Sequence, residues 1–439
     1  MNSTAPRFAG ALVAAFAFAA AAPVGAAIPI DNWTAATGAK VYFVASPGLP
    51  ILDLQIAFPA GSAFDPPGKE GLAGMVTGTL DLGAGNLDEN AIAEKLADLG
   101  ARLGGSASSD RASVSLRTLS DLPTRNAALA LLKAVITQPA FPAAVVAREK
   151  ARAVAGLQDA LTRPDTLAAR AFDQALYGNH PYGRQTSVES LNAIGRDDLI
   201  AFHRERFTAP AAVVTIVGAV TAAEARVIAD DLTAGLPRTQ PAMSLPPVAL
   251  PAAQTIPVPH PATQAHVLIG TPAMRRGDPD YFPLYVGNYV LGGGGFVSRL
   301  TNEIRDKRGL AYSVYSYFNP QKELGPMQIG LQTKAEQADE AIALVRQTLD
   351  DFLRNGPTET ELAAAKANLV GGFPLRLDSN RKILDNVAVI AGYGLPLDWL
   401  DTYRDRVAAV TIDDIRAAFA RRIKPEHLIT VRTTRDAGG

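Results

Sequence analysis

The stretch IGRDDLIAFHRERFTAPAAVVTIV (Ile194–Val217) has a counterpart near the C-terminus, VTIDDIRAAFARRIKPEHLITVRT (Val410–Thr433). Two more pairs of segments occur in the same order along the chain. They are AREKARAVAGL (Ala147–Leu157) with AAAKANLVGGF (Ala363–Phe373), and IAFPAGSAFDPP (Ile56–Pro67) with IGTPAMRRGDPD (Ile269–Asp280). Matches that keep their order and nearly keep their spacing predict an internal duplication, and therefore two domains of the same fold.

A proline-rich segment separates the two copies. Eight prolines fall between Pro237 and Pro261, which blocks a helix and disfavours a central strand. We interpret residues 236–262 as a semi-rigid extended linker. It divides the chain into an N-terminal domain, residues 28–235, and a C-terminal domain, residues 263–439.

Both halves mix the periodicities of strands and helices. Leu52–Phe58 and Arg111–Leu119 alternate apolar and polar residues as half-buried strands do, whereas Ala127–Ile136 and Ile342–Leu353 are apolar at helical spacing. The elements come in pairs of like type rather than in strict alternation of strand and helix. This arrangement favours an α+β fold in which each domain packs an antiparallel sheet against helices.

The first 27 residues have the composition of a secretory signal. Arg7 precedes the apolar run AGALVAAFAFAAAA, and small residues follow near Ala26. We therefore expect a signal peptide over residues 1–27 and an exported protein, most consistent with a bacterial periplasm. No later segment is apolar for long enough to cross a membrane.

Composition excludes several classes of function. The chain of 439 residues contains no cysteine, which rules out disulfides, thiol nucleophiles and thiolate zinc sites. Its net charge is −1, and it has no run of Lys and Arg that could follow a nucleic-acid backbone.

The usual catalytic motifs are also missing. The chain has no H-E-x-x-H, H-x-x-E-H or G-x-S-x-G, and no G-K-[ST] follows LGGGGF (Leu291–Phe296), which we interpret as a tight connection. No histidine has another three or four residues away, so we expect each to be a surface or loop imidazole. The five are His180, His203, His260, His266 and His427.

One stretch carries a possible reactive pair. In TNEIRDKRGLAYSVYSYF (Thr301–Phe318), Arg305 precedes Tyr312 by seven residues across a turn. A guanidinium and a phenol are donors suited to a peptide carbonyl or a developing oxyanion. Alternatively, the arginine only pairs with a nearby carboxylate and the tyrosine only packs.

The same stretch resembles the second-domain motif of the pitrilysin-type zinc metallopeptidases, the inverted zincins that include mitochondrial processing peptidase. LGGGGFVSRL (Leu291–Leu300) and GNHPYG (Gly178–Gly183) resemble two further landmarks of that family. The resemblance implies two homologous domains of the mitochondrial processing peptidase type. It also implies that Arg305 and Tyr312 assist catalysis from the domain that holds no zinc.

The zinc motif itself is degenerate. Active members of the family carry H-x-x-E-H after a run resembling DPPGKEGLA (Asp65–Ala73). Here Gly74 takes the place of the first histidine, Thr77 that of the glutamate and Gly78 that of the second histidine. The position of the third ligand falls on Gly156. Both the ligands and the general base are absent from this pattern.

The resemblance therefore implies the non-catalytic subunit of a two-chain peptidase. Such a subunit holds no metal and is inactive alone. It pairs as a heterodimer with a homologous H-x-x-E-H chain that carries zinc, and it supplies Arg305 and Tyr312 to the substrate peptide. The alternative hypothesis is a non-enzymatic peptide-binding or scaffold protein that forms a homodimeric chamber.

Overall fold

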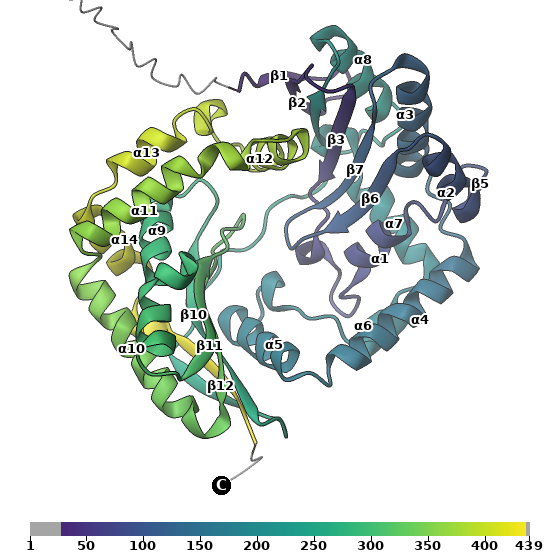
Figure 1. The fold of residues 1–439 in the computed structure, drawn as a ribbon. Coiled ribbons are helices and arrows are strands. Elements are labelled where there is room, and N and C mark those ends of the chain that lie inside the picture. The colour runs from purple at the N-terminus through teal and green to yellow at the C-terminus, as the bar shows by residue number, and fades with distance from the viewer. Residues whose placement is uncertain (1–27, 436–439) are drawn as a thin grey trace, which may run out of the picture.

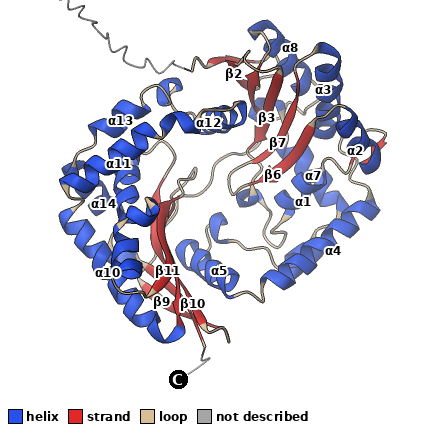
Figure 2. Ribbon diagram, viewed as in Figure 1, coloured by secondary structure: helices blue, strands red, loops and turns tan. Residues whose placement is uncertain are grey.

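The computed structural model describes residues 28–435, so the expected signal peptide lies outside the described residues. Figures 1 and 2 show two domains, each with one sheet and a set of helices, joined by an extended segment that runs between them. The predicted α+β class with two domains of one type is confirmed.

The N-terminal domain is built on a six-stranded sheet of order β1-β2-β8-β3-β7-β6. A separate two-stranded ribbon, β4 (Gly83–Ala84) with β5 (Leu87–Asp88), lies outside it. The strands of the large sheet are β1 (Asp31–Thr34), β2 (Lys40–Ala45), β3 (Ile51–Phe58), β6 (Arg102–Ala107), β7 (Ala112–Leu119) and β8 (Val213–Gly218).

The C-terminal sheet repeats this topology without the first strand. Its order is β9-β13-β10-β12-β11, which matches β2-β8-β3-β7-β6 strand for strand and supports the duplication. The strands are β9 (Gln254–Pro259), β10 (Gln264–Met274), β11 (Ala311–Phe318), β12 (Gly325–Lys334) and β13 (Ile429–Thr434).

Two details of the sheets differ from the sequence predictions. The sheets are mixed, because β2 runs parallel to β8 and β9 runs parallel to β13, while the other pairs are antiparallel. The C-terminal sheet also begins at Gln254, inside the segment predicted to be linker. Prolines are tolerated there because β9 is an edge strand, where one row of backbone groups needs no partner.

Both domains are rich in helices, most of which cover one face of the sheet of their own domain and form the main core with it. In the N-terminal domain they are α1 (Leu72–Thr79), α2 (Glu89–Asp98), α3 (Leu122–Thr137), α4 (Ala143–Ala160), α5 (Pro164–Tyr177), α6 (Val188–Ala193), α7 (Arg196–Arg206) and α8 (Ala222–Thr233). In the C-terminal domain they are α9 (Tyr281–Asn288), α10 (Ala338–Asn355), α11 (Glu359–Gly371), α12 (Asn380–Tyr393), α13 (Tyr403–Ala409) and α14 (Ile412–Arg422).

The domains exchange one helix each. Helix α12 of the C-terminal domain packs Leu384 and Val387 against Val44 and Val217 on the second face of the N-terminal sheet. Reciprocally, α5 of the N-terminal domain packs on β10 and β13 of the C-terminal sheet. Figure 1 shows α12 beside β2 and β3, and α5 beside β10 and β11. Burial of both sheet faces therefore requires both domains.

Asp110 links the domains by hydrogen bonds. Its carboxylate is buried and accepts the hydroxyls of Tyr182 at 2.5 Å and Tyr393 at 2.8 Å, together with the backbone N–H of Lys322 at 2.9 Å. Tyr182 belongs to the N-terminal domain, whereas Tyr393 and Lys322 belong to the C-terminal one. One side chain therefore satisfies three donors from two domains.

Replacing Asp110 by alanine should destabilise the protein. The change leaves three buried or half-buried donors without their acceptor, which should lower the free energy of unfolding by roughly 2–4 kcal/mol. Denaturant unfolding followed by circular dichroism measures this loss. The control Asp351→Ala, which removes only an exposed pair with Arg354, should cost under about 0.5 kcal/mol. Equal losses in both variants would contradict the linking role.

Two histidines are buried. The prediction of a surface or loop imidazole is wrong for His203, which lies within a helix, whereas His180 does lie in a loop. His203 lies on the buried side of α7, and Nε2 donates to the carbonyl oxygen of Ile136 at 2.9 Å. His180 is also buried, and its Nε2 lies 2.9 Å from the carbonyl oxygen of Pro246. Each imidazole packs against aromatic rings, with Phe207 stacked on His203. A neutral imidazole with one hydrogen bond can be buried at little cost.

His203 makes stability depend on pH. Burial lowers the pKa of His203 to about 4, below the value near 6.5 in an unfolded chain. The unfolded state therefore binds the proton more readily, and stability is lost as pH falls from about 6.5 towards 4, by about 3 kcal/mol in all. In His203→Phe this loss should disappear. The stability of the variant relative to wild type should therefore rise as pH falls, and a difference independent of pH would contradict the assignment.

Candidate functional site

Arg305 and Tyr312 lie side by side at the surface of the C-terminal domain. The Cζ atom of Arg305 is 5.5 Å from the ring centre of Tyr312 and 4.8 Å from that of Phe296. The guanidinium comes from a helical turn over Thr301–Asp306, and the phenol from β11. Both side chains line a cavity of about 410 Å³, together with glycines of the loop before them.

A β-bulge directs Tyr312 outward. Ala311 pairs with Thr333 and Ser313 with Gln332, so Tyr312 is the extra residue between two consecutive partners. Bulges re-aim side chains and are frequent beside active sites. As a result the Tyr312 side chain is 86% exposed although it belongs to a sheet.

Within residues 28–435, the guanidinium of Arg305 has no anionic partner. The neighbouring carboxylate of Glu303 pairs instead with Lys307 at 2.6 Å and with Arg308 at 2.9 Å. In residues 28–435 no hydrogen bond or ion pair engages the Arg305 side chain, whose guanidinium lies over the rings of Phe296 and Tyr312. The alternative that Arg305 is a simple salt-bridge partner is wrong, and its donors are free for a ligand.

The glycine-rich segment Leu291–Phe296 packs closely against strand β11. A Cβ on Gly292 would lie 2.4 Å from Oγ of Ser316 on β11, so only glycine fits there. Asn288 fixes the same strand, because its Nδ2 donates to the backbone oxygen of Ser316 at 3.1 Å. The predicted role of LGGGGF as a tight connection is confirmed.

A second cavity, of about 500 Å³, lies between α1 and α4. Gly74 and Gly78 face it from α1, and a Cβ at either position would meet no atom within 4 Å. The helix start is fixed by buried Asp65, which accepts the backbone N–H groups of Gly71 and Ala73 at 2.8 Å each. Burial raises the pKa of Asp65 to about 6. The start of α1 is therefore held in place. At two positions of the degenerate motif, Gly74 and Gly78, the helix presents only glycine to the cavity.

The other degenerate positions lie on either side of this cavity. Thr77 is buried on the far side of α1, where its hydroxyl donates to the carbonyl oxygen of Ala73 at 2.9 Å. Gly156 lies on α4 between Ala153 and Leu157, which line the cavity. Glu149 also lines it, but its carboxylate is held by Arg148 at 2.8 Å and Arg152 at 2.9 Å.

Metal ligation has no basis in the described residues. Within residues 28–435, no group of three or more His, Cys, Asp or Glu side chains lies together in a way that could hold a metal ion. In the same range, none of the helices combines the length and apolar composition needed to span a bilayer.

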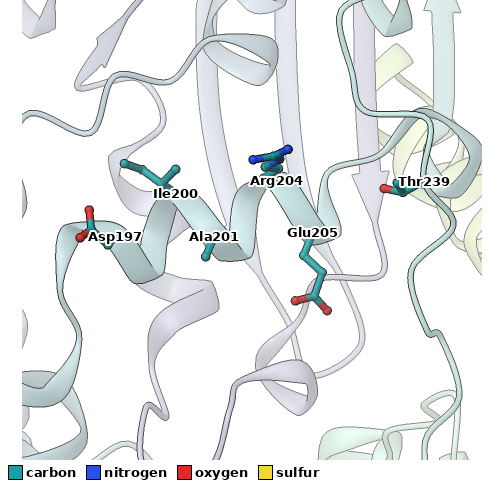
Figure 3. A pocket seen from close by; sticks show the side chains of 6 residues that line it. All are labelled: Asp197, Ile200, Ala201, Arg204, Glu205 and Thr239. Carbon is teal, nitrogen blue, oxygen red and sulfur yellow. The ribbon is translucent and has the colours of Figure 1, made fainter.

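A hollow of about 560 Å³ along α7 does not form a reactive site. Figure 3 shows that Asp197, Arg204 and Glu205 point in different directions from the helix. Thr239 of the linker completes the lining. Acid–base or nucleophilic chemistry needs side chains that converge on one point, and these do not.

Comparisons with known proteins identify the family. The profile described as "Insulinase (Peptidase family M16)" matches residues 41–189, and that described as "Peptidase M16 inactive domain" matches residues 193–369. A solved structure of a peptidase M16 inactive domain from Pseudomonas fluorescens is 34% identical, with a TM-score of 0.90. That alignment covers 94% of this chain and 99% of the other. The chain belongs to peptidase family M16.

Two relatives indicate how far the similarity extends. The "Non-peptidase homolog YmxG" of Helicobacter pylori is 27% identical over 371 residues, which is 84% of this chain and 85% of that protein. An uncharacterised zinc protease of Streptomyces coelicolor is 29% identical over 260 residues, which is 56% of this chain. The match spans about half the length of the Streptomyces protein, 55%. By similarity to the inactive-domain profile and to the non-peptidase homologue, the chain is an inactive member of the family.

Proposed function

We propose that this chain is the zinc-free subunit of a heterodimeric metallopeptidase. Its partner is a homologous chain with H-x-x-E-H that holds the zinc ion. In the complex, Arg305 and Tyr312 bind the substrate peptide and polarise its scissile carbonyl at the partner's zinc. The observation that carries the proposal is the Arg305–Tyr312 pair, exposed and free of protein partners, in a chain whose motif positions hold no zinc ligand.

The geometry of the pair suits a developing oxyanion. A guanidinium presents several N–H donors in one plane, and a phenol presents one O–H donor. Neither side chain donates a hydrogen bond within the described residues, so both are available to a substrate oxygen. Donors placed where negative charge develops are among the strongest contributors to rate enhancement.

The neighbouring strand supports a peptide as the ligand. In the described part of the chain β11 is the edge of its sheet, so one row of its backbone N–H and C=O groups has no partner strand there. An extended peptide can add to such an edge, with its alternate side chains contacting the exposed rings of Tyr315 and Tyr317. The peptide carbonyls would then lie near Tyr312 on the same strand.

The place of action in this proposal is the periplasm. The signal-like residues 1–27 support export, and the absence of cysteine means that no disulfide has to form there. Fractionation of native cells, with detection of the mature chain in the osmotic-shock fraction, tests this part.

Association with the partner is tested on the purified chains. The mature chain and the H-x-x-E-H homologue should form a 1:1 complex in size-exclusion chromatography with light scattering. Metal analysis should find about one zinc per complex and none in this chain alone. Recovery of only a homodimer of this chain, with no affinity for the homologue, would refute the heterodimer.

The homodimeric scaffold remains the second candidate. The Helicobacter pylori relative supports it, because that protein is described as a non-peptidase homologue and aligns over most of this chain. The two candidates differ in one result. A scaffold binds peptide as a homodimer and gives no hydrolysis with any H-x-x-E-H chain.

A further inference from the structure

A third cavity lies at the boundary between the two domains and belongs to neither of the sites above. Its volume is about 360 Å³, and both domains line it. Lys40 and Arg111 enter it from the N-terminal domain, and Arg276 and Lys322 from the C-terminal domain. The lining thus contains four cationic side chains drawn from four separate segments of the chain.

None of these cations forms an ion pair with any residue in the range 28–435. Arg111 donates to the backbone oxygen of Ala388 at 3.1 Å, and Lys322 donates to that of Met243. Nε of Arg276 is buried without a hydrogen-bond partner. A buried guanidinium N–H without an acceptor is costly, so an acceptor from outside the chain, either water or an anion, would stabilise Arg276 in this position.

The one carboxylate in the lining cannot fill that role. Asp110 already accepts three hydrogen bonds, from two tyrosine hydroxyls and one backbone N–H. That backbone N–H belongs to Lys322, and none of the four cationic side chains donates to Asp110 within the described residues. The cavity therefore carries an excess of positive charge, with like charges brought together across the domain boundary.

Both arginines of the cavity, Arg111 and Arg276, pack against the ring of Tyr393. The Cζ atoms of Arg111 and Arg276 lie 4.4 Å and 5.6 Å from the ring centre of Tyr393. Burial raises the pKa of Tyr393 to about 12, so its phenol stays neutral and keeps its hydrogen bond to Asp110. The two guanidinium groups are thus held by one fixed ring rather than by a flexible surface.

Close packing against Gly392 also fixes the position of the Arg111 guanidinium. A Cβ on Gly392 would lie 1.4 Å from Nη1 of Arg111, so the guanidinium occupies the space that any larger residue would take. The rest of the lining is mostly apolar and includes Phe58, Pro59 and Val213. The cavity therefore combines a preorganised cationic side with an apolar wall, as small-molecule sites commonly do.

We propose that this cavity binds a small organic anion whose carboxylate or phosphate group is held by Arg111 and Arg276, with Lys40 and Lys322 adding charge. Guanidinium groups bind both kinds of oxyanion through paired N–H donors. The apolar part of the ligand lies against Phe58 and Pro59. Because two cations come from each domain, a bound anion strengthens the contact between the domains.

The test uses the mature chain alone, so its outcome is independent of any partner subunit. Isothermal titration at constant ionic strength measures binding of citrate and of inorganic phosphate, with chloride as the background anion. The two titrations distinguish a carboxylate from a phosphate preference. At least one anion should bind saturably with a millimolar or lower Kd, and saturation should raise Tm by a few degrees.

The charge-removing variant is Lys40→Gln/Arg276→Gln. Neither side chain makes a hydrogen bond or ion pair in the described part of the chain, so the variant should fold. It should bind the anion at least tenfold more weakly, whereas Arg163→Gln/Lys424→Gln, which removes two exposed charges elsewhere, should bind as wild type does. If the double variant fails to fold, Lys40→Gln alone should still weaken binding severalfold. No saturable binding to wild type, or equal affinity in wild type and the Lys40 and Arg276 variants, would overturn the proposal.

Discussion

In the reconstituted two-chain peptidase, Tyr312→Phe and Arg305→Ala should each lower kcat/KM by about 10²-fold. Removing one donor that stabilises a developing oxyanion typically costs that much, roughly 3 kcal/mol of transition-state stabilisation. Tyr312→Phe deletes only the hydroxyl of a side chain that is 86% exposed. Steady-state hydrolysis of a fluorogenic peptide measures both effects.

A matched control lies two residues after the helical turn Thr301–Asp306. Arg308 is an arginine three residues further along, and it is paired with Glu303 rather than facing the cavity. Arg308→Ala should leave kcat/KM within about twofold of wild type. The assigned roles are wrong if Tyr312→Phe and Arg305→Ala also remain within twofold while the complex forms normally.

Installing the missing ligands should create a zinc site in this chain. In Gly74→His/Thr77→Glu/Gly78→His/Gly156→Glu, three of the four new side chains replace glycines at which a Cβ meets nothing within 4 Å. Helix α1 is already formed and its first turn is held by Asp65, so the two histidines would lie one turn apart on the cavity side. We expect zinc binding with a Kd of about 1 µM or tighter, corresponding to about −8 kcal/mol.

The control for this variant separates helix stability from ligation. Gly74→Ala/Gly78→Ala/Gly156→Ala should stabilise the fold by roughly 0.5–1 kcal/mol at each position, because alanine favours a helix interior, and it should bind no zinc. Competition with a chromophoric chelator measures affinity in both variants. A folded quadruple variant that binds zinc no better than wild type would show that α1 and α4 do not keep the spacing of a zinc site.

Local patterns were sufficient to predict much of the fold. The alternation in Leu52–Phe58 and Arg111–Leu119 corresponds to β3 and β7, which pair with each other. The repeated segments predicted two like domains, and the sheets have the same strand order. These features depend on residues close in sequence or on a comparison of the chain with itself.

The exchange of helices could not be predicted in this way. Nothing in α5 or α12 distinguishes a helix that packs on its own sheet from one that packs on the other domain's sheet. The parallel pairs β2–β8 and β9–β13 join strands far apart in sequence, and the pairing depends on the closed fold. The burial of His203 is also not predictable from the sequence. A polar imidazole is expected at the surface unless a partner is known, and its partner, the carbonyl oxygen of Ile136, is 67 residues away in sequence.

The two sites also differ in how far the sequence could predict them. Arg305 and Tyr312 are seven residues apart in one stretch, so their proximity could be anticipated from a turn and a strand. The cavity with Arg111 and Arg276 has no motif, because its cations come from separate segments in two domains. Asp110 likewise gave no signal, since its three donors are brought together only by the tertiary structure.

The most direct test of the central claim is a titration of activity. The homologous H-x-x-E-H chain is held at a fixed concentration with its zinc, and the mature chain is added while peptide hydrolysis is followed. The heterodimer predicts almost no hydrolysis by either chain alone, and a rate that rises with added chain and saturates at a 1:1 ratio. Hydrolysis by the H-x-x-E-H chain that is independent of this protein, or no hydrolysis at any ratio, would contradict the account.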